Sequence, residues 1–280
     1  MTAPHHCDDD HDDFGGLQRD LFATGPKMDR RYALRLAAQF GAGLGFLQLM
    51  SCGDSASLAA VDSGTNTSTS TCPGKVPEET QGPFPADSSN GINVLNLSGV
   101  VRSDITTSFA GLSGTAAGVP MTLVLTLVSE STCAPLANRA VYVWHCDRGG
   151  LYSLYSAGAT NQNYLRGVQQ TDANGKVTFA SIFLACYSGR WPHIHFEVYP
   201  SLASATTAAS RTATSQIALP KATCDEVYAT TGYATSVTNL SRISLATDGI
   251  FSDGYSLELA TVTGTVAAGL TATLTVGISA

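Results

Sequence analysis

The apolar residues of this chain fall mainly in short runs that alternate with polar residues, and glycine, proline, asparagine and aspartate separate the runs. The run M-T-L-V-L-T-L-V at residues 121–128 is the clearest example. Side chains two positions apart leave the same face of a strand, so Thr122, Val124, Thr126 and Val128 would share one face. The alternation predicts a β-strand at this position.

Similar runs recur along the rest of the chain. Residues 139–146 (R-A-V-Y-V-W-H-C) predict a second strand, which follows a turn signal at Ala134-Pro135. The turn-forming sequence D-A-N-G at residues 172–175 precedes another short run, K-V-T-F. Residues 257–279 hold two more runs rich in threonine and valine. The pattern predicts several short strands joined by turns.

Helical periodicity is missing after residue 75, where no window of about 12 or more residues shows it. We therefore predict an all-β fold: a β-sandwich of mostly antiparallel strands that forms a single domain over residues 76–280. The long stretch 153–168 carries no clear strand pattern and is predicted to be a functional loop.

Residues 1–52 have the pattern of an export signal. The sequence D-R-R-Y-A-L-R-L contains the paired arginines of a Tat-type signal, Arg30 and Arg31, and an apolar run follows it. The run is short for a spanning helix and ends in L-M-S-C, with Cys52 where a lipoprotein's cysteine would be acylated. We expect export across the cytoplasmic membrane, giving a cell-surface lipoprotein or a secreted protein. A buried amphipathic helix is the alternative.

Two further stretches are low in complexity. Residues 5–13 (H-H-C-D-D-D-H-D-D) are acidic and rich in histidine, which predicts a solvated tail, although such a tract can bind a metal adventitiously. Residues 53–75 are rich in serine, threonine, alanine and glycine. Such a stretch buries too little apolar surface to order itself, so we predict a flexible linker.

Composition narrows the class of partner. The chain has 280 residues, 44% of them hydrophobic and 13% charged, which suffices for one β domain with an N-terminal extension. A formal charge of −7 and the lack of any lysine and arginine stripe exclude a nucleic-acid surface. Contact with a membrane would run only through a lipid on Cys52. Nothing in the pattern indicates an oligomeric state.

The cysteines fit an oxidising compartment. Cys7 lies in the predicted signal region and Cys52 is the candidate lipid anchor, which leaves an odd number in the predicted domain and its linker. One or two disulfides are expected in an exported protein, but their connectivity stays open. No C-x-x-C pair occurs, so a cysteine-based zinc site is not expected. The remaining cysteines are Cys72, Cys133, Cys146, Cys186 and Cys224.

The strongest candidate for chemistry is Y-S-G-R-W-P-H-I-H at residues 187–195. His193 and His195 are two apart, so both imidazoles would leave the same face of a strand. Two neutral imidazoles make half of a site for iron, zinc or copper, although such pairs also occur on surfaces and in cores. A second aromatic cluster, W-H-C-D-R-G-G-L-Y-S at residues 144–153, strengthens the interpretation as a site.

Together these clusters resemble the intradiol ring-cleavage dioxygenases, non-haem iron(III) enzymes that split catechols between their two hydroxyls. In that family a tyrosine lies eight residues after a tryptophan in a glycine-containing turn, which here gives Trp144 and Tyr152. A second tyrosine then precedes an arginine three residues before His-x-His. Here these are Tyr187, Arg190, His193 and His195.

The resemblance extends to two other segments, residues 164–179 and E-E-T-Q-G-P-F at residues 78–84, the latter of which walls the substrate cavity in relatives. It runs from about residue 77 to the C-terminus and is closest to the exported, single-domain branch of the family.

The resemblance implies a cofactor, Fe(3+), held by Tyr152, Tyr187, His193 and His195 with water or hydroxide in a fifth position. Phenolate oxygen suits this hard ion, and imidazole completes its coordination. It also implies a catecholic small molecule and O2 as partners, and a muconate-type diacid as product. Tyr187 would leave the metal and take a substrate proton, and Arg190 would stabilise anionic character on the substrate.

Plainer interpretations stand beside these assignments. The two tyrosines can be ordinary half-buried aromatics, and Arg190 a surface ion-pair partner. His145 follows Trp144 directly, so the two cannot both face a metal, and we expect His145 either to support a metal ligand or to be structural. The remaining neighbours are predicted to line the core or the cavity: Glu79, Phe84, Trp144, Tyr155 and Tyr164.

Two other functions stay open at this point. A non-catalytic, exported β-sandwich module for binding or adhesion explains the low charge and the serine- and threonine-rich linker, but not the ordered set of tyrosines, arginine and histidines. A copper or zinc protein that uses His193 and His195 fits a site with fewer tyrosines better. Metal analysis separates the three functions.

Overall fold

The computed structural model describes residues 72–279. The predicted export signal, the acidic tract, Cys52 and nearly all of the predicted linker therefore lie outside the described residues.

The first of two sheets contains four strands in the order β4-β1-β8-β7. These strands are β4 (Lys176–Ile182), β1 (Pro120–Ser129), β8 (Gly269–Ile278) and β7 (Thr261–Thr265). Strands β1 and β8 run parallel, whereas the β1–β4 and β7–β8 pairs are antiparallel.

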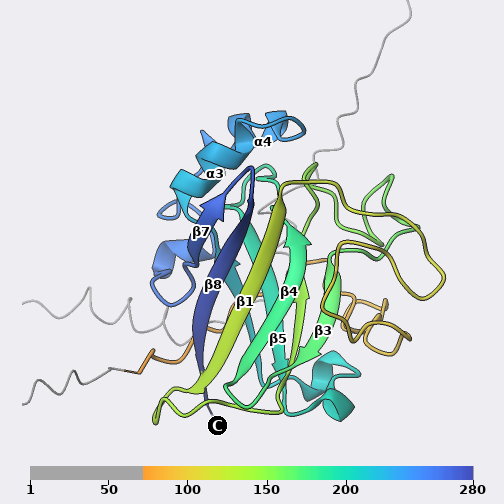
Figure 1. Ribbon diagram of the computed structural model, residues 1–280, viewed down its shortest axis with the longest axis vertical. Helices are drawn as coiled ribbons and strands as arrows, with labels where there is room; N and C mark the ends of the chain where they lie inside the picture. Colours follow the sequence, from red (N-terminus) through yellow and green to blue (C-terminus); the bar gives the residue numbers. More distant parts are fainter. Residues whose placement is uncertain (1–71, 280) are drawn as a thin grey trace, which may run out of the picture. The chain divides into compact units, whose positions relative to one another are not determined.

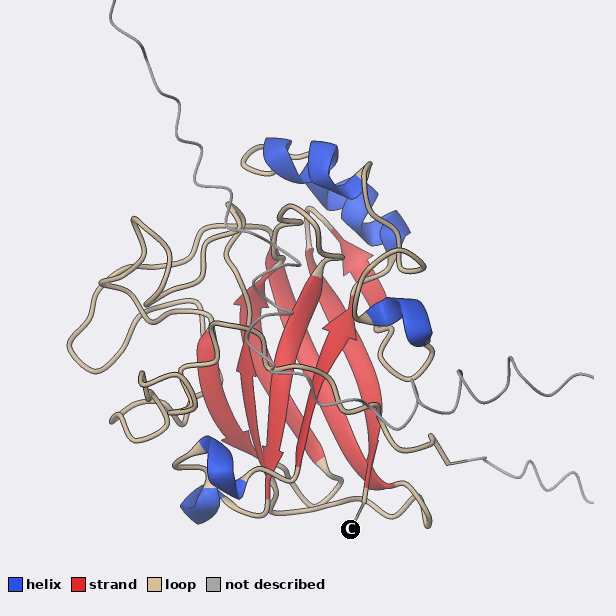
Figure 2. Ribbon diagram, turned by 180° about the vertical axis from the view of Figure 1, so that it is seen from behind, coloured by secondary structure: helices blue, strands red, loops and turns tan. Residues whose placement is uncertain are grey.

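The second sheet also has four strands, in the order β3-β2-β5-β6, and all of its pairs are antiparallel. They are β3 (Arg166–Gln170), β2 (Ala140–Trp144), β5 (His193–Tyr199) and β6 (Ala213–Ala218). Figures 1 and 2 show the two sheets stacked face to face. The prediction of an all-β sandwich with mostly antiparallel strands is confirmed.

The alternation along β1 builds one wall of the core. Met121, Leu123, Leu125 and Leu127 are each at most 1% exposed, while the threonines between them are half-buried. Burying a leucine side chain stabilises a fold by roughly 2 kcal/mol, so this one face supplies several kcal/mol. The predicted strand at residues 121–128 is thereby confirmed.

Register identifies the two faces of the second sheet. Trp144 lies opposite His195 in the β2–β5 pair, and opposite residues of an antiparallel pair point the same way. His145, on the other face, reaches Ser181 of β4 in the first sheet with its Nε2 atom at 2.8 Å. His195 and Trp144 therefore occupy the outer face, away from the first sheet.

The outer face of the second sheet is nevertheless buried, because the segment that leads to β1 crosses it. The backbone N–H of Thr214 donates to the Glu78 carboxylate, and the Gln216 amide donates to the Thr80 carbonyl. The Tyr142 hydroxyl donates to the Pro85 carbonyl. As a result, every residue of β5 is buried, including those whose side chains point to the outer face. A buried polar layer of this kind is where a site can be dry and preorganised.

Short helices cover the ends of the sandwich and were not predicted. Helices α3 (Lys221–Tyr228) and α4 (Ala234–Leu240) lie together at one end (Figure 1). They hold 8 and 7 residues, too few to give a periodic signal above the polar background. Three single turns of 3-10 helix occupy Leu202–Ser204, Ala208–Ser210 and Phe251–Asp253. Among residues 72–279, no helix is long and apolar enough to cross a bilayer.

One disulfide joins Cys72 to Cys133. It ties the start of the described chain to the turn after β1, a few residues from where Val76 bonds to Gly277 of β8. The expectation of one or two disulfides is met by this one within the described residues. Cys146, Cys186 and Cys224 are buried free thiols.

Candidate metal centre

Strand β5 places the two predicted histidines together. His193 and His195 are 1% and 2% exposed, and their Nε2 atoms lie 3.2 Å apart. Between them Ile194 points into the core, where it is fully buried. The apolar residue thus anchors the strand while both imidazoles converge on one point of the outer face.

Hydrogen bonding fixes the tautomer of His193. Its Nδ1 atom lies 2.6 Å from the carbonyl oxygen of Trp191, which can only accept, so Nδ1 carries the proton. The lone pair is then on Nε2, the atom that faces His195. A carbonyl on the far nitrogen of an imidazole is the usual support for a metal ligand.

Burial keeps both imidazoles neutral. It is the main cause that lowers the pKa of His193 well below its ordinary value, and the positive charge of Arg190 lowers it further. Burial likewise lowers the pKa of His195, followed by His193, Arg190 and Arg166. Metal ligation requires the neutral form, so both rings are ready to donate a lone pair without first losing a proton.

Both predicted tyrosines lie beside the histidines. The Tyr187 hydroxyl is 3.2 Å from Nε2 of His193. The ring of Tyr152, only 3% exposed, lies 6.0 Å from that of Tyr187 and 6.3 Å from that of His195 between centroids. The sequence separations are large, yet the loops after β2 and β4 bring the two phenols and two imidazoles to one place.

Gly150 allows the two loops to approach. Its φ of +87° lies in the region that residues with a side chain rarely adopt, and a Cβ atom there would lie 3.3 Å from Cβ of Tyr187. Glycine therefore permits both the turn before Tyr152 and the close contact with the second tyrosine.

The donor set decides which metals fit. Within residues 72–279, no group of three or more His, Cys, Asp or Glu side chains could hold a metal ion. The phenols of Tyr152 and Tyr187 lie beside the two histidines and are therefore the candidate further ligands. Two phenol oxygens and two neutral imidazole nitrogens suit a hard, highly charged ion such as iron(III), so the residues fit the implied cofactor.

Arg190 is buried in an ion pair instead of lying on the surface. Its Nε donates to Asp248 at 3.0 Å, and its Nη2 donates to Gln216 at 2.6 Å. Gln216 lies opposite His195 in the β5–β6 pair. No sequence pattern pointed to Asp248 or Gln216, because neither belongs to a spaced motif and the fold brings both to the centre.

The predicted wall residues surround the centre. Trp144 stacks on His195 with ring centroids 4.9 Å apart and planes 2° from parallel. Phe84 contacts Tyr152 and Tyr155, each at 5.0 Å between centroids. The segment 78–84 therefore lies against the centre, as the resemblance implies, and Trp144 acts as a wall that holds the imidazole plane.

Other candidates are engaged elsewhere. The Tyr155 hydroxyl donates to Asn90 and accepts from the backbone N–H of Ala86, while the Tyr164 hydroxyl donates to Asp147. His145 lies on the inner face, as predicted. These contacts assign the three side chains structural roles. The backbone of Glu79 bonds to that of Thr214, which holds the wall segment on β6.

Further along the same face, β5 carries a buried acid. Glu197 accepts from the Tyr199 hydroxyl at 2.6 Å and lies beside the fully buried Asp87. Arg211 is 3.7 Å from Glu197 and 3.8 Å from Asp87 but is partly exposed. Burial first, and then the charge of Asp87, raise the pKa of Glu197 to about 8.

This acid gives a prediction for pH. The folded pKa of about 8 exceeds the ordinary value of 4.5, so the folded state holds the proton more tightly and stability falls as pH rises between these values. Between pH 5 and pH 8 the free energy of unfolding of the wild type should fall by on the order of 3 kcal/mol, and Glu197→Gln should remove this loss. Urea unfolding at both pH values measures it. The control is Glu226→Gln, an exposed glutamate on α3. The prediction would be contradicted if the free energy of unfolding depended on pH equally in the wild type and in Glu197→Gln.

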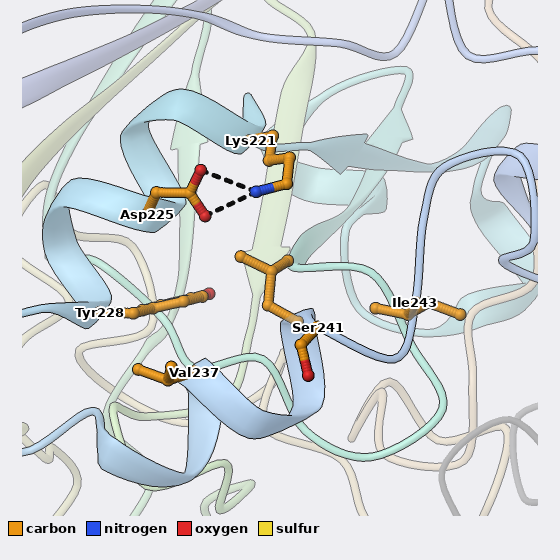
Figure 3. A pocket seen from close by; sticks show the side chains of 7 residues that line it. Lys221, Asp225, Tyr228, Val237, Ser241 and Ile243 are labelled. Carbon is orange, nitrogen blue, oxygen red and sulfur yellow. Dashed lines mark hydrogen bonds and ion pairs between the residues drawn. The ribbon is translucent and has the colours of Figure 1, made fainter.

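A separate pocket lies between α3 and α4 (Figure 3). Its walls are mainly apolar, and the exposed ion pair between Lys221 and Asp225, at 2.7 Å, closes one side. None of the residues of the candidate centre lines it.

Comparison with known proteins agrees with the geometry. Residues 100–213 match the model of a protein family described as Dioxygenase, and this stretch contains all five predicted site residues. The solved intradiol ring-cleavage dioxygenase from Tetranychus urticae is 24% identical, with a TM-score of 0.52 over 64% of this chain and 86% of that chain. Another solved dioxygenase is 23% identical, with a TM-score of 0.58 over 73% of this chain and 94% of that chain. No curated protein matches in sequence. The predicted resemblance is confirmed.

Proposed function

We propose that the chain is an iron(III) enzyme of the intradiol ring-cleavage type; the match of residues 100–213 to a dioxygenase family and the fold shared with a solved intradiol dioxygenase support this proposal. The enzyme cleaves the ring of a catechol between its two hydroxyls and inserts both atoms of O2, which gives a muconate-type diacid. The observation that carries the proposal is the convergence of two phenols on two imidazoles whose Nε2 atoms lie 3.2 Å apart.

Iron(III) would be held by Tyr152, Tyr187, His193 and His195. When bound, it draws electron density from a chelated catecholate and so allows the ring to react with O2. The neutral imidazoles need lose no proton to bind the ion. The stack of Trp144 on His195 and the Trp191 carbonyl on His193 hold both rings in place.

The protein residues would then handle protons and charge. Tyr187 is only partly buried and lies in the loop between β4 and β5, so its phenol oxygen can leave the centre and accept a proton from a substrate hydroxyl. Arg190 donates hydrogen bonds from a fixed, buried position next to the centre, which stabilises negative charge on substrate oxygens. Phe84 and Tyr155 exclude water above Tyr152.

The test combines metal analysis with product analysis. The protein purified with iron should contain about one iron per chain and show a broad red-purple band, which shifts to longer wavelength with catechol and weakens in Tyr152→Phe. When the reaction is run with isotopically labelled O2, both labelled oxygen atoms should appear in a single molecule of the diacid product. A colourless protein without iron would favour a binding module, and copper or zinc in its place would favour the third function.

Replacing Arg190 should lower turnover far more than iron content. Arg190→Gln removes a preorganised donor, for which the expected loss is about 10²–10³-fold in kcat, while iron content stays close to that of the wild type. The control is Arg242→Gln, the same change at an exposed arginine. Iron and turnover falling in equal proportion would assign Arg190 a structural role only.

We also propose that the protein is exported through the signal around Arg30 and Arg31 and anchored through Cys52. The disulfide between Cys72 and Cys133 supports an oxidising compartment. Replacing both Arg30 and Arg31 with lysine should leave precursor in the cytoplasm, measured by cell fractionation. Arg35→Lys, in the same segment, should not. Unchanged export of the double variant would remove the proposal.

A further inference from the structure

Asp248 binds the arginine of the candidate centre from a completely buried position. Its Oδ2 atom accepts from Nε of Arg190 at 3.0 Å and from the backbone N–H of Trp191 at 2.7 Å. The carbonyl oxygen of Trp191 in turn accepts a hydrogen bond from Nδ1 of His193. One carboxylate oxygen is therefore linked to both the arginine and a predicted ligand.

The other oxygen of Asp248 fixes the carboxylate in its own loop. Oδ1 accepts from the backbone N–H groups of Ile250 and Phe251 at 2.8 and 3.1 Å. The Phe251 ring lies 6.5 Å from that of His193. With both oxygens bound, Asp248 cannot turn away from Arg190 when a substrate enters, so the ion pair persists in the complex.

The charge of Arg190 is thereby balanced inside the site. Its side chain is 1% exposed and that of Asp248 is 0% exposed, so water does not screen the pair. Nη2 is directed to Gln216. The pair still offers a dipole for charge that develops on catecholate oxygens, but it provides no net positive charge for a further anion.

Arg166, a second arginine near the centre, already donates to backbone and hydroxyl groups. Arg166 donates to the Ser153 hydroxyl and carbonyl, the Pro85 carbonyl and the Tyr142 hydroxyl, at 3.0 to 3.2 Å. The Tyr155 ring lies 5.4 Å from the guanidinium carbon. To reach a ligand carboxylate, Arg166 would have to break contacts that hold the wall of the centre.

We propose that the site selects catechols without an ionised substituent, and that Asp248 sets this selectivity by neutralising Arg190. The inference rests on the proposed function. Once Tyr187 has left the centre and taken a proton, the Tyr152 phenolate and the two oxygens of a catecholate already balance the charge of iron(III). Among the described residues, Arg190 and Arg166 both already have partners, so a buried ring carboxylate would have to displace one of these contacts to gain compensation for its desolvation.

The test compares three ring compounds: catechol, the carboxylated protocatechuate, and its uncharged amide. The amide matches the acid in size, so the ratio of kcat/KM for amide over acid isolates charge. We expect a ratio of at least about 10 for the wild type. Equilibrium dialysis without oxygen should show the same order of affinity. An acid that is bound and cleaved as well as its amide would overturn the proposal.

Variants then test the role of Asp248. Asp248→Asn should lower the amide-to-acid ratio by about tenfold, because Arg190 regains a net charge, whereas a merely structural defect lowers both rates and leaves the ratio unchanged. Asp248→Glu retains the charge and should keep the wild-type ratio even if both rates fall. The matched control is Asp225→Asn, which removes the same charge from the surface pair of Figure 3.

The outcomes separate this inference from the proposed function. If none of the three compounds is bound or cleaved by the iron-loaded protein, the proposed function fails. If catechol is cleaved and the acid is preferred to the amide, only the selectivity fails. If the wild-type ratio is high and Asp248→Asn leaves it unchanged, Asp248 is not its cause.

Discussion

His195→Gln should reduce bound iron by at least about tenfold and abolish ring cleavage. Among residues 72–279, His195 is one of two imidazoles on the outer face near the tyrosines, and its ring is held by Trp144 at 4.9 Å. With one imidazole removed, the remaining donors no longer complete the coordination of the ion. Metal analysis of the purified protein, visible absorption and oxygen consumption with catechol measure the three consequences.

The matched control is His145→Gln. His145 is equally buried and lies in the same domain, but its Nε2 bonds to Ser181 between the sheets. His145→Gln should lower the melting temperature but leave the ratio of iron to folded protein unchanged. A thermal melt and a metal analysis measure these two quantities. Retention of iron by His195→Gln, or an equal loss in both variants, would remove His195 from the ligand set.

Cys133→Ser should lower the free energy of unfolding by about 4 kcal/mol. The disulfide joins residues 61 apart in sequence, so it removes much of the freedom of the unfolded chain. It also holds the segment that bonds Val76 to Gly277 and then continues to the wall of the centre. Urea unfolding at equilibrium gives the difference.

Reduction provides the control for this variant. A thiol reductant should lower the stability of the wild type to that of Cys133→Ser and leave the variant itself unchanged, because the described free thiols form no bond that it could break. A reductant that destabilises both proteins equally would show that another disulfide carries the effect.

Local pattern located β1 but not every strand. The stretch 153–168, predicted as a loop, includes the start of β3, and β6 was not predicted, because buried polar residues such as Arg166 and Gln216 hide the alternation. The alternation at residues 121–128 predicts β1 to within one residue at each end, because one buried face imposes a period of two. The 3-10 turns and α3 and α4 escaped prediction since they are short and stabilised by packing. Tyr228, for example, is held by its hydrogen bond to the Leu184 carbonyl.

The spacing of His193 and His195 was enough to predict that they share a face, because it matches the period of a strand. Motif order added Tyr152, Tyr187 and Arg190 to the candidate site, and their role as ligands and donor stays a prediction. By contrast, the pairing of Arg190 with Asp248, 58 residues away, and of Cys72 with Cys133 became visible only in the folded chain. Such contacts depend on the path of every intervening loop, and a buried carboxylate carries no local pattern that names its partner.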